Sequence, residues 1–318
     1  MDSRQKIEFL KDRTISNMVS DTINFVKINY KSLFSGLFYI CTPALLLFGV
    51  FTFLFFNNYF NFTLTSFMGA SPYTGTSAPE EFIGFLPYLF LFFAGSFLAI
   101  SFVSTASYAY VKLYKNEEEI TTASLWSTSR RYLGKVLGAQ LLLFVLLIIA
   151  YGICFIPLFL GTIGAFLMLL LFLIFFVGVF HFSIKLTFFQ AFIILEDAGI
   201  IESFKRSYKF TTGIFWKTFL FMLLIGFIGY FFAYLLQLPG IIFIYFNFIM
   251  GIVSGNSDSS FSILLGSALT GLGSAFGCIL YSIIFIGICF LYYSVIENRQ
   301  GTGIKGEIDT IGEKENSD

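Results

Sequence analysis

Charged residues are missing from four long stretches of this 318-residue sequence. Residues 33–79, 82–111, 136–184 and 259–296 contain no Asp, Glu, Lys or Arg. An ionisable side chain inside a membrane is costly, and where one occurs it usually marks a proton relay, an ion site or a counter-ion. The absence therefore removes the usual residues of proton-coupled transport and of aspartyl or metal-dependent intramembrane proteolysis.

Histidine and cysteine are also scarce. The single histidine, His181, cannot form a zinc site without further ligands, and no Cys, Asp or Glu lies near it in helical register. We interpret it as a polar residue at the membrane interface. The four cysteines form no CxxC pair, and all lie in apolar runs: Cys41, Cys154, Cys278 and Cys289. We expect them to be small buried side chains rather than disulfides or metal ligands.

Common catalytic motifs are absent from the sequence. There is no GxSxG, HExxH, Walker-type glycine loop or GxGxxG. A Ser-His-carboxylate set would have to use His181, whose own apolar run contains no carboxylate. We therefore expect no catalytic residue, no cofactor and no metal, and the chain is predicted not to be an enzyme. The formal net charge of zero gives no reason to expect a nucleic-acid partner.

Apolar residues dominate the composition: 57% of the chain is hydrophobic and 12% is charged, whereas about a quarter of an ordinary soluble domain is charged. A membrane span needs ~20 mostly apolar residues. The pattern predicts an all-α membrane protein with six transmembrane helices, at residues 33–56, 83–111, 136–157, 161–194, 216–239 and 262–296. The apolar stretch 241–253 is too short for a seventh span, so we interpret it as interfacial or re-entrant. The polar, amphipathic start argues against a cleaved signal peptide.

The basic residues predict the topology. If the N-terminus is inside, the inner segments of a six-span chain contain all 19 Lys and Arg residues. The outer loops then carry only Glu80, Glu81 and Asp258. The positive-inside rule therefore places both ends in the cytoplasm of a plasma membrane. Residues 1–32 are expected to form a cytoplasmic amphipathic helix, and residues 297–318 a cytoplasmic tail.

A weak threefold repeat is visible when the spans are compared. Amphipathic basic stretches precede each odd span, at residues 15–31, 120–135 and 200–217. Pro157 and Pro239 each follow the closing lysine of such a stretch by 22 residues and are expected to mark the outer end of a span. The even spans are long and are expected to project into the cytoplasm. The repeating unit is an interfacial helix followed by two spans. A true triplication would produce this pattern, and so would the features that membrane helices generally share.

Two sets of small or polar residues lie within the predicted spans. In the second span, Ser101, Ser104 and Tyr108 share one face, which either lines a pathway or, as we favour, packs against a neighbouring helix. In the last span, small residues that let helices approach closely are Gly266, Gly273, Ser274 and Gly277. Their contact is either within the chain, which we favour, or with another subunit.

The third inner loop is the most distinctive stretch. An acidic helix end is followed by a short basic amphipathic helix, with Gly213 as a predicted C-cap. The simpler interpretation is a surface helix held on anionic lipid, where each basic residue contributes about 1 kcal/mol of binding free energy. The more specific interpretation is a docking site for a partner or a lipid headgroup. The candidate contact residues in this loop and in the preceding inner segment are Lys205, Arg206, Lys209, Trp216, Lys217, Arg130 and Arg131.

The same loop carries a family resemblance. Its pattern contains Glu196, the run from Glu202 through Phe204, Lys205, Arg206 and Ser207, then Gly213, Trp216, Lys217, Thr218 and Phe219. This pattern resembles one found in a broad group of bacterial multi-span proteins. The group includes the membrane domain fused to some glycerophosphodiester phosphodiesterases and related membrane families of unknown function. The likeness covers about residues 195–219 and, more weakly, the stretch from Tyr292 to Ile304. It implies a bacterial inner-membrane protein without the phosphodiesterase barrel, so that activity is not implied.

Two functional hypotheses follow. The first is a non-enzymatic scaffold or accessory subunit of a membrane assembly, whose basic inner helices contact anionic lipid headgroups, a protein partner or a second copy. The second is an uncoupled or lipid-handling transporter that uses the polar face of Ser101, Ser104 and Tyr108.

Overall fold

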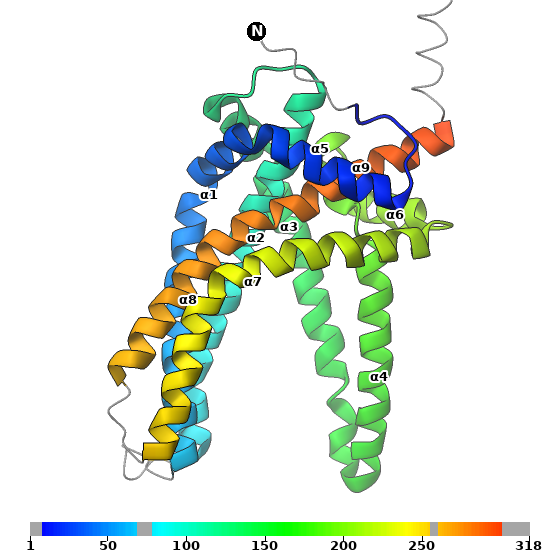
Figure 1. The fold of residues 1–318 in the computed structure, drawn as a ribbon. Coiled ribbons are helices and arrows are strands. Elements are labelled where there is room, and N and C mark those ends of the chain that lie inside the picture. The colour runs from blue at the N-terminus through cyan, green and yellow to red at the C-terminus, as the bar shows by residue number, and fades with distance from the viewer. Residues whose placement is uncertain (1–7, 69–77, 255–259, 301–318) are drawn as a thin grey trace, which may run out of the picture. The chain divides into compact units, whose positions relative to one another are not determined.

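The computed structural model describes residues 8–68, 78–254 and 260–300. Those residues are helical, with short connections and no strand among them (Figure 1). The prediction of an all-α chain is therefore confirmed. The elements are α1 (Ile15–Met68), α2 (Ala78–Lys115), α3 (Thr122–Ile153), the 3₁₀ helix η1 (Ile156–Leu160), α4 (Gly161–Lys185), α5 (Phe189–Leu195), α6 (Ile200–Thr211), α7 (Phe215–Ser254), α8 (Ser260–Leu280) and α9 (Ser282–Gln300).

Several of these helices are long and apolar enough to cross a membrane. Five stretches of the described residues meet that condition: Ile15–Phe60, Ile83–Lys115, Thr122–Leu195, Phe215–Met250 and Phe261–Gln300. The third stretch contains two long helices, α3 and α4, joined by η1. The chain therefore has five to six helices able to span a bilayer, as expected of a multi-pass membrane protein.

The chain divides into two compact units. Unit 1 comprises residues 1–30, 108–225 and 285–318, and unit 2 comprises residues 31–107 and 226–284. Helices α1, α2, α7 and α9 each contribute to both units. Among the described Lys and Arg residues, all except Lys31 belong to unit 1.

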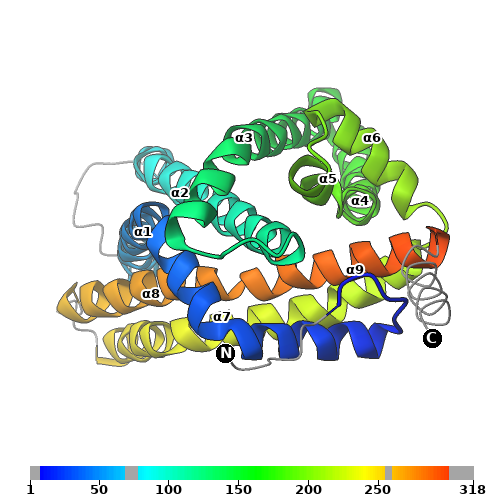
Figure 2. The ribbon, with the colours of Figure 1, turned by 90° about the horizontal axis from the view of Figure 1, so that it is seen from above.

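Unit 1 contains the α3–α4 hairpin with α5 and α6 packed on it. Helix α3 contacts α4, α5 and α6, and α6 also contacts α4 and α5, and Figure 2 shows α5 lying among the other three. Burial on α3 ends at Ala139, because its buried residues are Leu125, Ser129, Tyr132, Val136 and Ala139. We name the charged end of unit 1 the head and define it as residues 8–30, 110–135, 185–217 and 290–300.

An aromatic cluster forms the core of the head. Phe9 stacks on Phe290 with ring centroids 4.6 Å apart, and its edges meet Phe25, Tyr114 and Tyr293. Aromatic side chains bury large areas and pack favourably edge to face. The segment before α1 is therefore folded against α9 rather than trailing from the first helix.

Unit 2 contains close helix contacts made by glycine. A Cβ added at Gly273 of α8 would lie 2.3 Å from the carbonyl oxygen of Leu236 in α7. A Cβ at Gly277 would lie 2.8 Å from the carbonyl oxygen of Ala233. Without side chains at these positions, α8 can approach the backbone of α7, which is how small residues bring membrane helices together.

Two other residues of the same ridge lie nearby. A Cβ at Gly266 would meet Ile244 Cγ1 at 2.4 Å, and Ser274 is buried with its hydroxyl donating to the carbonyl of Thr270 at 2.8 Å. The ridge of small residues in α8 thus lies against another helix of this chain.

The structure differs from the prediction at two amphipathic stretches and at one proline. The basic stretches 15–31 and 120–135 are not separate helices but the first turns of α1 and α3, whereas 200–217 does contain a separate helix, α6. Pro239 does not end a helix: α7 continues through it to Ser254, so 241–253 is neither re-entrant nor a separate segment. Next to this proline α7 lies close to α8, since a Cβ at Gly240 would meet Thr270 N at 2.4 Å.

The predicted fourth and sixth spans are each interrupted. The fourth is α4 up to Lys185 and then α5, while the sixth is divided at Tyr281 into α8 and α9. At the first break the hydroxyl of Ser207 accepts from the N–H of Phe188 at 3.1 Å and donates to the carbonyl of Lys185 at 2.9 Å. A side chain from α6 thus satisfies backbone groups that the interrupted helix leaves open.

Candidate functional site

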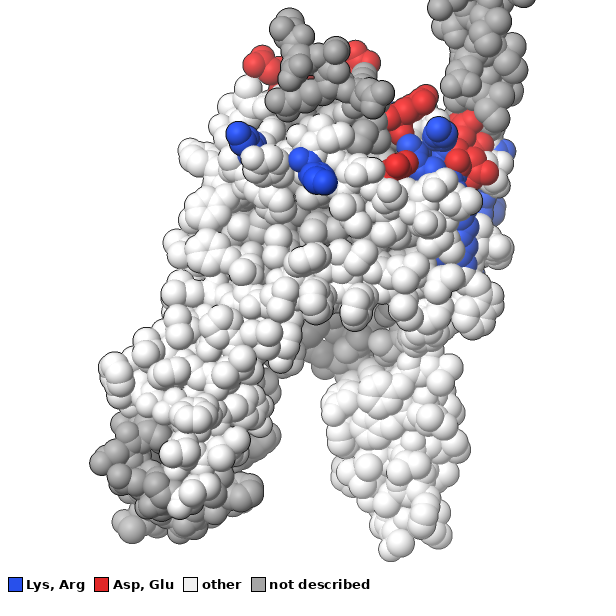
Figure 3. Space-filling model, viewed as in Figure 1, with Lys and Arg blue, Asp and Glu red and all other residues white. Residues whose placement is uncertain are grey.

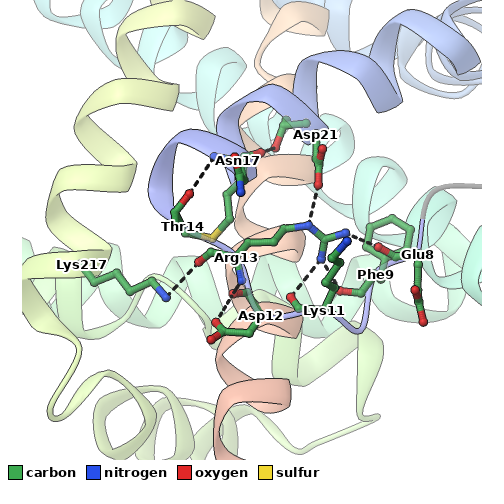
Figure 4. A network of polar contacts seen from close by, with 12 residues as sticks. Glu8, Phe9, Lys11, Asp12, Arg13, Thr14, Asn17, Asp21 and Lys217 are labelled. Carbon is green, nitrogen blue, oxygen red and sulfur yellow. Dashed lines mark hydrogen bonds and ion pairs between the residues drawn. The ribbon is translucent and has the colours of Figure 1, made fainter. Parts of the chain in front are cut away.

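Arg13 organises the N-terminal side of the head (Figure 4). Its guanidinium donates to the carboxylate of Asp21 at 2.6 Å and to the carbonyls of Phe9 and Lys11 at 2.9 and 3.1 Å. It also donates to the carbonyl of Glu8. Arg13 is 5% exposed, so this cation is buried with a carboxylate and several carbonyl oxygens around it.

The backbone of Arg13 extends these links to two other helices. Its N–H donates to the hydroxyl of Ser294 in α9 at 3.0 Å, and its carbonyl accepts from Lys217 Nζ in α7 at 3.3 Å (Figure 4). Lys217, predicted as a contact residue, therefore has an internal partner. The sequence showed Arg13 only as one inside charge among many, and no local signal marks its role.

Lys112 forms the centre of a second cluster. Its ammonium lies 2.7 Å from the hydroxyl of Tyr132, 2.7 Å from the carbonyl of Ile194 and 3.0 Å from the carboxylate of Asp197. Tyr132 in turn donates to Asp197, and Arg131 lies 3.4 Å from the same carboxylate. The cluster joins the end of α2 to α3 and to the α5–α6 connection, and the sequence did not predict it.

Asp197 is the acidic member of that cluster and has a positive φ of 57°. Partial desolvation raises its pKa, but hydrogen bonds from Tyr132 and Lys112 and the charges of Lys112 and Arg131 outweigh that effect. The pKa of Asp197 is therefore below its ordinary value, and the ionised form is favoured.

Glu196 and Arg206 form the third cluster. Arg206 donates to Glu196 at 2.7 Å and to Glu202 one turn earlier on α6. Tyr292 of α9 donates its hydroxyl to the other oxygen of Glu196. The hydrogen bond to Glu202 and the charges of both carboxylates raise the pKa of Arg206. Glu196, Glu202 and Arg206 thus connect α5, α6 and α9.

The C-terminus of α6 has its own caps. Gly213 has a φ of +88° and follows the extended residue Thr212, so it occupies the left-handed position that glycine adopts without strain. Arg299 of α9 donates to the carbonyl of Phe210 at 2.8 Å and of Thr212 at 3.3 Å. Cations are favourable at a helix C-terminus because the macrodipole is negative there.

Other predicted contact residues project outward from the head. Arg130, Lys205 and Lys209 are exposed, and no described carboxylate pairs with them. Trp216 is 72% exposed at the start of α7. Figure 3 shows no charged side chain on the part of the α3–α4 hairpin that lies away from the head, since residues 136–184 contain no Lys, Arg, Asp or Glu. The head thus uses some of its charges internally and presents others at its surface.

A cavity of about 970 Å³ lies within unit 1. The α3–α4 hairpin forms one wall, α5 and α6 form the end nearest the head, and side chains of α2, α7 and α9 complete it. Most of the lining is apolar, and the polar lining residues Ser183, Thr187, Gln190, Lys205 and Tyr208 come from the end of α4, its link to α5, α5 and α6. No sequence pattern indicated this cavity, because its walls are brought together from seven helices.

The proposed pathway residues are buried. Ser101 and Ser104 have no exposed surface, and their hydroxyls donate to the carbonyls of Phe97 and Ser101 in the same helix. Tyr108 is fully buried, lines the cavity of unit 1 and has no hydrogen-bond partner for its hydroxyl among the described residues. The geometry of the two serines is that of helix packing.

The scarce residue types have ordinary surroundings. His181 is exposed and stacks on Phe215 with ring centroids 5.2 Å apart. The four cysteines are buried and unbridged. Within the described ranges no group of three or more His, Cys, Asp and Glu residues could hold a metal ion.

Comparison with known proteins gives no further guide. The chain matches no family model, no curated protein and no solved structure.

Proposed function

We propose that this chain is a non-enzymatic protein of a bacterial inner membrane, with six spans in three helix pairs and both termini in the cytoplasm. It acts as a scaffold or accessory subunit whose head binds anionic lipid headgroups and a partner protein at the cytoplasmic surface. The positive-inside rule supports this orientation, since all the described Lys and Arg residues except Lys31 belong to the head.

The observation that carries the proposal is the division of basic residues within the head. Arg13 and Lys112 are held by carboxylates and carbonyls inside the folded head, and Arg206, though 46% exposed, is paired with Glu196 and Glu202. A second set, Lys205 and Lys209 on α6 together with Arg130 on α3, is exposed without a described acidic partner. The first set makes the surface rigid, and the second leaves positive charge available for an anionic ligand.

A shallow recess on the head adds to this surface. Its volume is about 260 Å³, and Phe192, Arg206, Lys209, Phe210 and Arg299 line it. Arginine and aromatic side chains are enriched where proteins contact partners. We propose that an acidic segment of a partner protein binds here beside the headgroups that Lys205 contacts.

The test compares partner capture by the wild type and by two variants. Cells expressing tagged full-length chain are cross-linked, extracted in mild detergent and examined by mass spectrometry. The triple variant Arg130→Gln, Lys205→Gln, Lys209→Gln should lose the captured partner. The control Lys27→Gln, another exposed lysine, should retain it. Equal capture by all three proteins, or a chain that is always monomeric and partner-free, would overturn the proposal.

The transporter hypothesis is the second candidate. Its proposed pathway requires Ser101 and Ser104 to meet water or substrate, whereas both side chains are buried and bonded to their own helix. The cavity of unit 1 is the feature that still favours lipid handling, because its lining is apolar with polar groups near the head.

A further inference from the structure

The cavity of unit 1 has walls suited to a hydrocarbon chain. Leu143, Leu146, Leu147 and Ala150 of α3 and Phe175, Val179 and Phe182 of α4 form its hairpin wall, with Met222, Phe285 and Ile288 completing the apolar lining. Its 970 Å³ lies near the upper end of the roughly 300–1,000 Å³ range of small-molecule sites. Leu147 and Phe182 are 44% and 55% exposed, so these wall side chains can also be reached from outside.

The polar residues of the cavity are concentrated near the head. Along α4 the lining passes from Phe175 to Ser183, which is about 12 Å of helix at 1.5 Å per residue. Beyond Ser183 follow Thr187, Gln190 and, on α6, Lys205. The site therefore has a long apolar part and a single polar part with a positive charge.

Two of these polar groups have no partner in the described chain. The ammonium of exposed Lys205 has no ion pair or hydrogen bond with a described residue. Gln190 is 6% exposed, and no described residue bonds its side-chain amide. The amide is not fully enclosed by protein, so it reaches the cavity that Gln190 lines and can bond a molecule held there.

We propose that this cavity binds one anionic glycerophospholipid from the adjacent leaflet. An acyl chain lies in the cavity along the wall formed by α3 and α4, and the phosphate contacts Lys205 while Gln190 donates to an oxygen of the phosphate or glycerol. The inference rests on the membrane placement and the lipid contact in the proposed function, but it needs no partner protein.

Charge and location favour this occupant over other apolar molecules. The walls belong to the stretch Thr122–Leu195, which is apolar enough to cross a membrane, so bilayer lipid is the most abundant ligand around it. A lone hydrocarbon would leave Lys205 and Gln190 without a partner, whereas a phosphate satisfies both a cation and an amide. The apolar length and the single charged end match an amphiphile with one anionic headgroup.

Native mass spectrometry of the purified full-length chain tests the proposal. The delipidated protein is titrated with phosphatidylglycerol or phosphatidylcholine of identical acyl chains. The wild type should retain one lipid and prefer phosphatidylglycerol. Lys205→Gln should reduce that preference about fivefold, which corresponds to about 1 kcal/mol for one basic residue near a membrane surface. Lys209→Gln is the matched control, because Lys209 is exposed on the same helix but does not line the cavity.

A second variant fills the apolar part without disturbing the backbone. Gly178 lines the cavity, and a Cβ added there would meet nothing within 4 Å. Gly178→Phe should therefore fold and should lose both lipids. Gly152→Phe is its control, since a Cβ at Gly152 also meets nothing and the residue lies outside the cavity. Thermal unfolding of both variants checks that the fold is intact, and Gly178→Leu replaces Gly178→Phe if the larger side chain prevents folding.

The outcomes separate the alternatives. Lipid retained by folded Gly178→Phe or Gly178→Leu, or equal loss from Lys205→Gln and Lys209→Gln, would overturn the cavity as the site. Equal binding of the two lipids by the wild type would overturn the anionic headgroup. Partner capture in the previous experiment is a separate readout, so either proposal can fail while the other stands.

Discussion

Tyr132 of α3 donates a hydrogen bond to the carboxylate of Asp197, which lies 65 positions further along the chain. Lys112 of α2 completes the contact, with its ammonium 2.7 Å from the phenol oxygen and 3.0 Å from the carboxylate. Three segments that the sequence showed as separate inner charges therefore form one cluster. Its members provide a direct test of how the head is held together.

Replacement of Asp197 should destabilise the head. Asp197→Asn removes the counter-charge of Lys112, whose side chain is only 19% exposed. Asparagine tolerates the positive φ of this position, so the substitution adds no backbone strain to the measured loss of stability. We expect a loss of about 1–2 kcal/mol, since the carboxylate is 44% exposed and partly screened. Thermal unfolding in detergent measures it, with Glu118→Gln as an exposed control.

The pH dependence of that loss follows from the lowered pKa of Asp197. A carboxylate whose pKa is lower in the folded state contributes stability above its unfolded pKa, and that stability is lost as the pH falls through the folded value. The difference in unfolding midpoint between wild type and Asp197→Asn should be constant above about pH 5 and vanish in stronger acid. A difference that grows on acidification would contradict the assignment.

Two tyrosines give a matched comparison. Tyr132→Phe removes the hydrogen bonds with Asp197 and Lys112 and should cost about 1–2 kcal/mol. Tyr108→Phe removes a buried hydroxyl that has no partner among the described residues, so it should be neutral or stabilising. Equilibrium unfolding of both variants decides the point. Comparable destabilisation by the two substitutions would show that Tyr108 has a bonding partner.

Cysteine labelling tests the pathway of the second candidate function. Ser101→Cys and Ser104→Cys should resist a water-soluble maleimide applied from either side of the membrane, because both positions are fully buried. Lys205→Cys, at an exposed position, is the positive control. The native cysteines are buried and should give little background. Rapid labelling of both serine positions would restore the pathway hypothesis.

The glycine contacts of α8 predict that a side chain added at Gly273 destabilises the packing of α8 against α7. Gly273→Ala places a Cβ 2.3 Å from a backbone carbonyl of α7 and should cost about 1–3 kcal/mol, despite the better helix propensity of alanine. Gly84→Ala is the control, since a Cβ there meets nothing within 4 Å. Unfolding midpoints of the two variants should therefore move in opposite directions or differ clearly. Equal midpoints would mean that α7 and α8 separate without cost.

The local pattern of residues was enough for the class of fold. Charge-free apolar runs must be helical in a bilayer, because lipid offers no partner for backbone N–H and C=O groups. The ends of the helices were less predictable where contacts with residues distant in the sequence determine them. Helix α7 continues through Pro239, and at the break after Lys185 the hydroxyl of Ser207 in α6 bonds the carbonyl of Lys185. Helical periodicity contains no information about such distant partners.

The sequence by itself determined that this chain is helical and multi-pass, and it placed within residues 200–217 the basic helix that carries Lys205 and Lys209. Only the tertiary structure decided which charges are used inside the head and which face outward. Arg13 and Ser294 are 281 positions apart, yet their contact helps to fold the first residues onto the last helix. The same is true of the cavity beside Lys205, because its walls come from helices spread along most of the chain. Burial and pairing of this kind depend on which helices meet, and that is set by packing across the whole fold rather than by neighbours in the sequence.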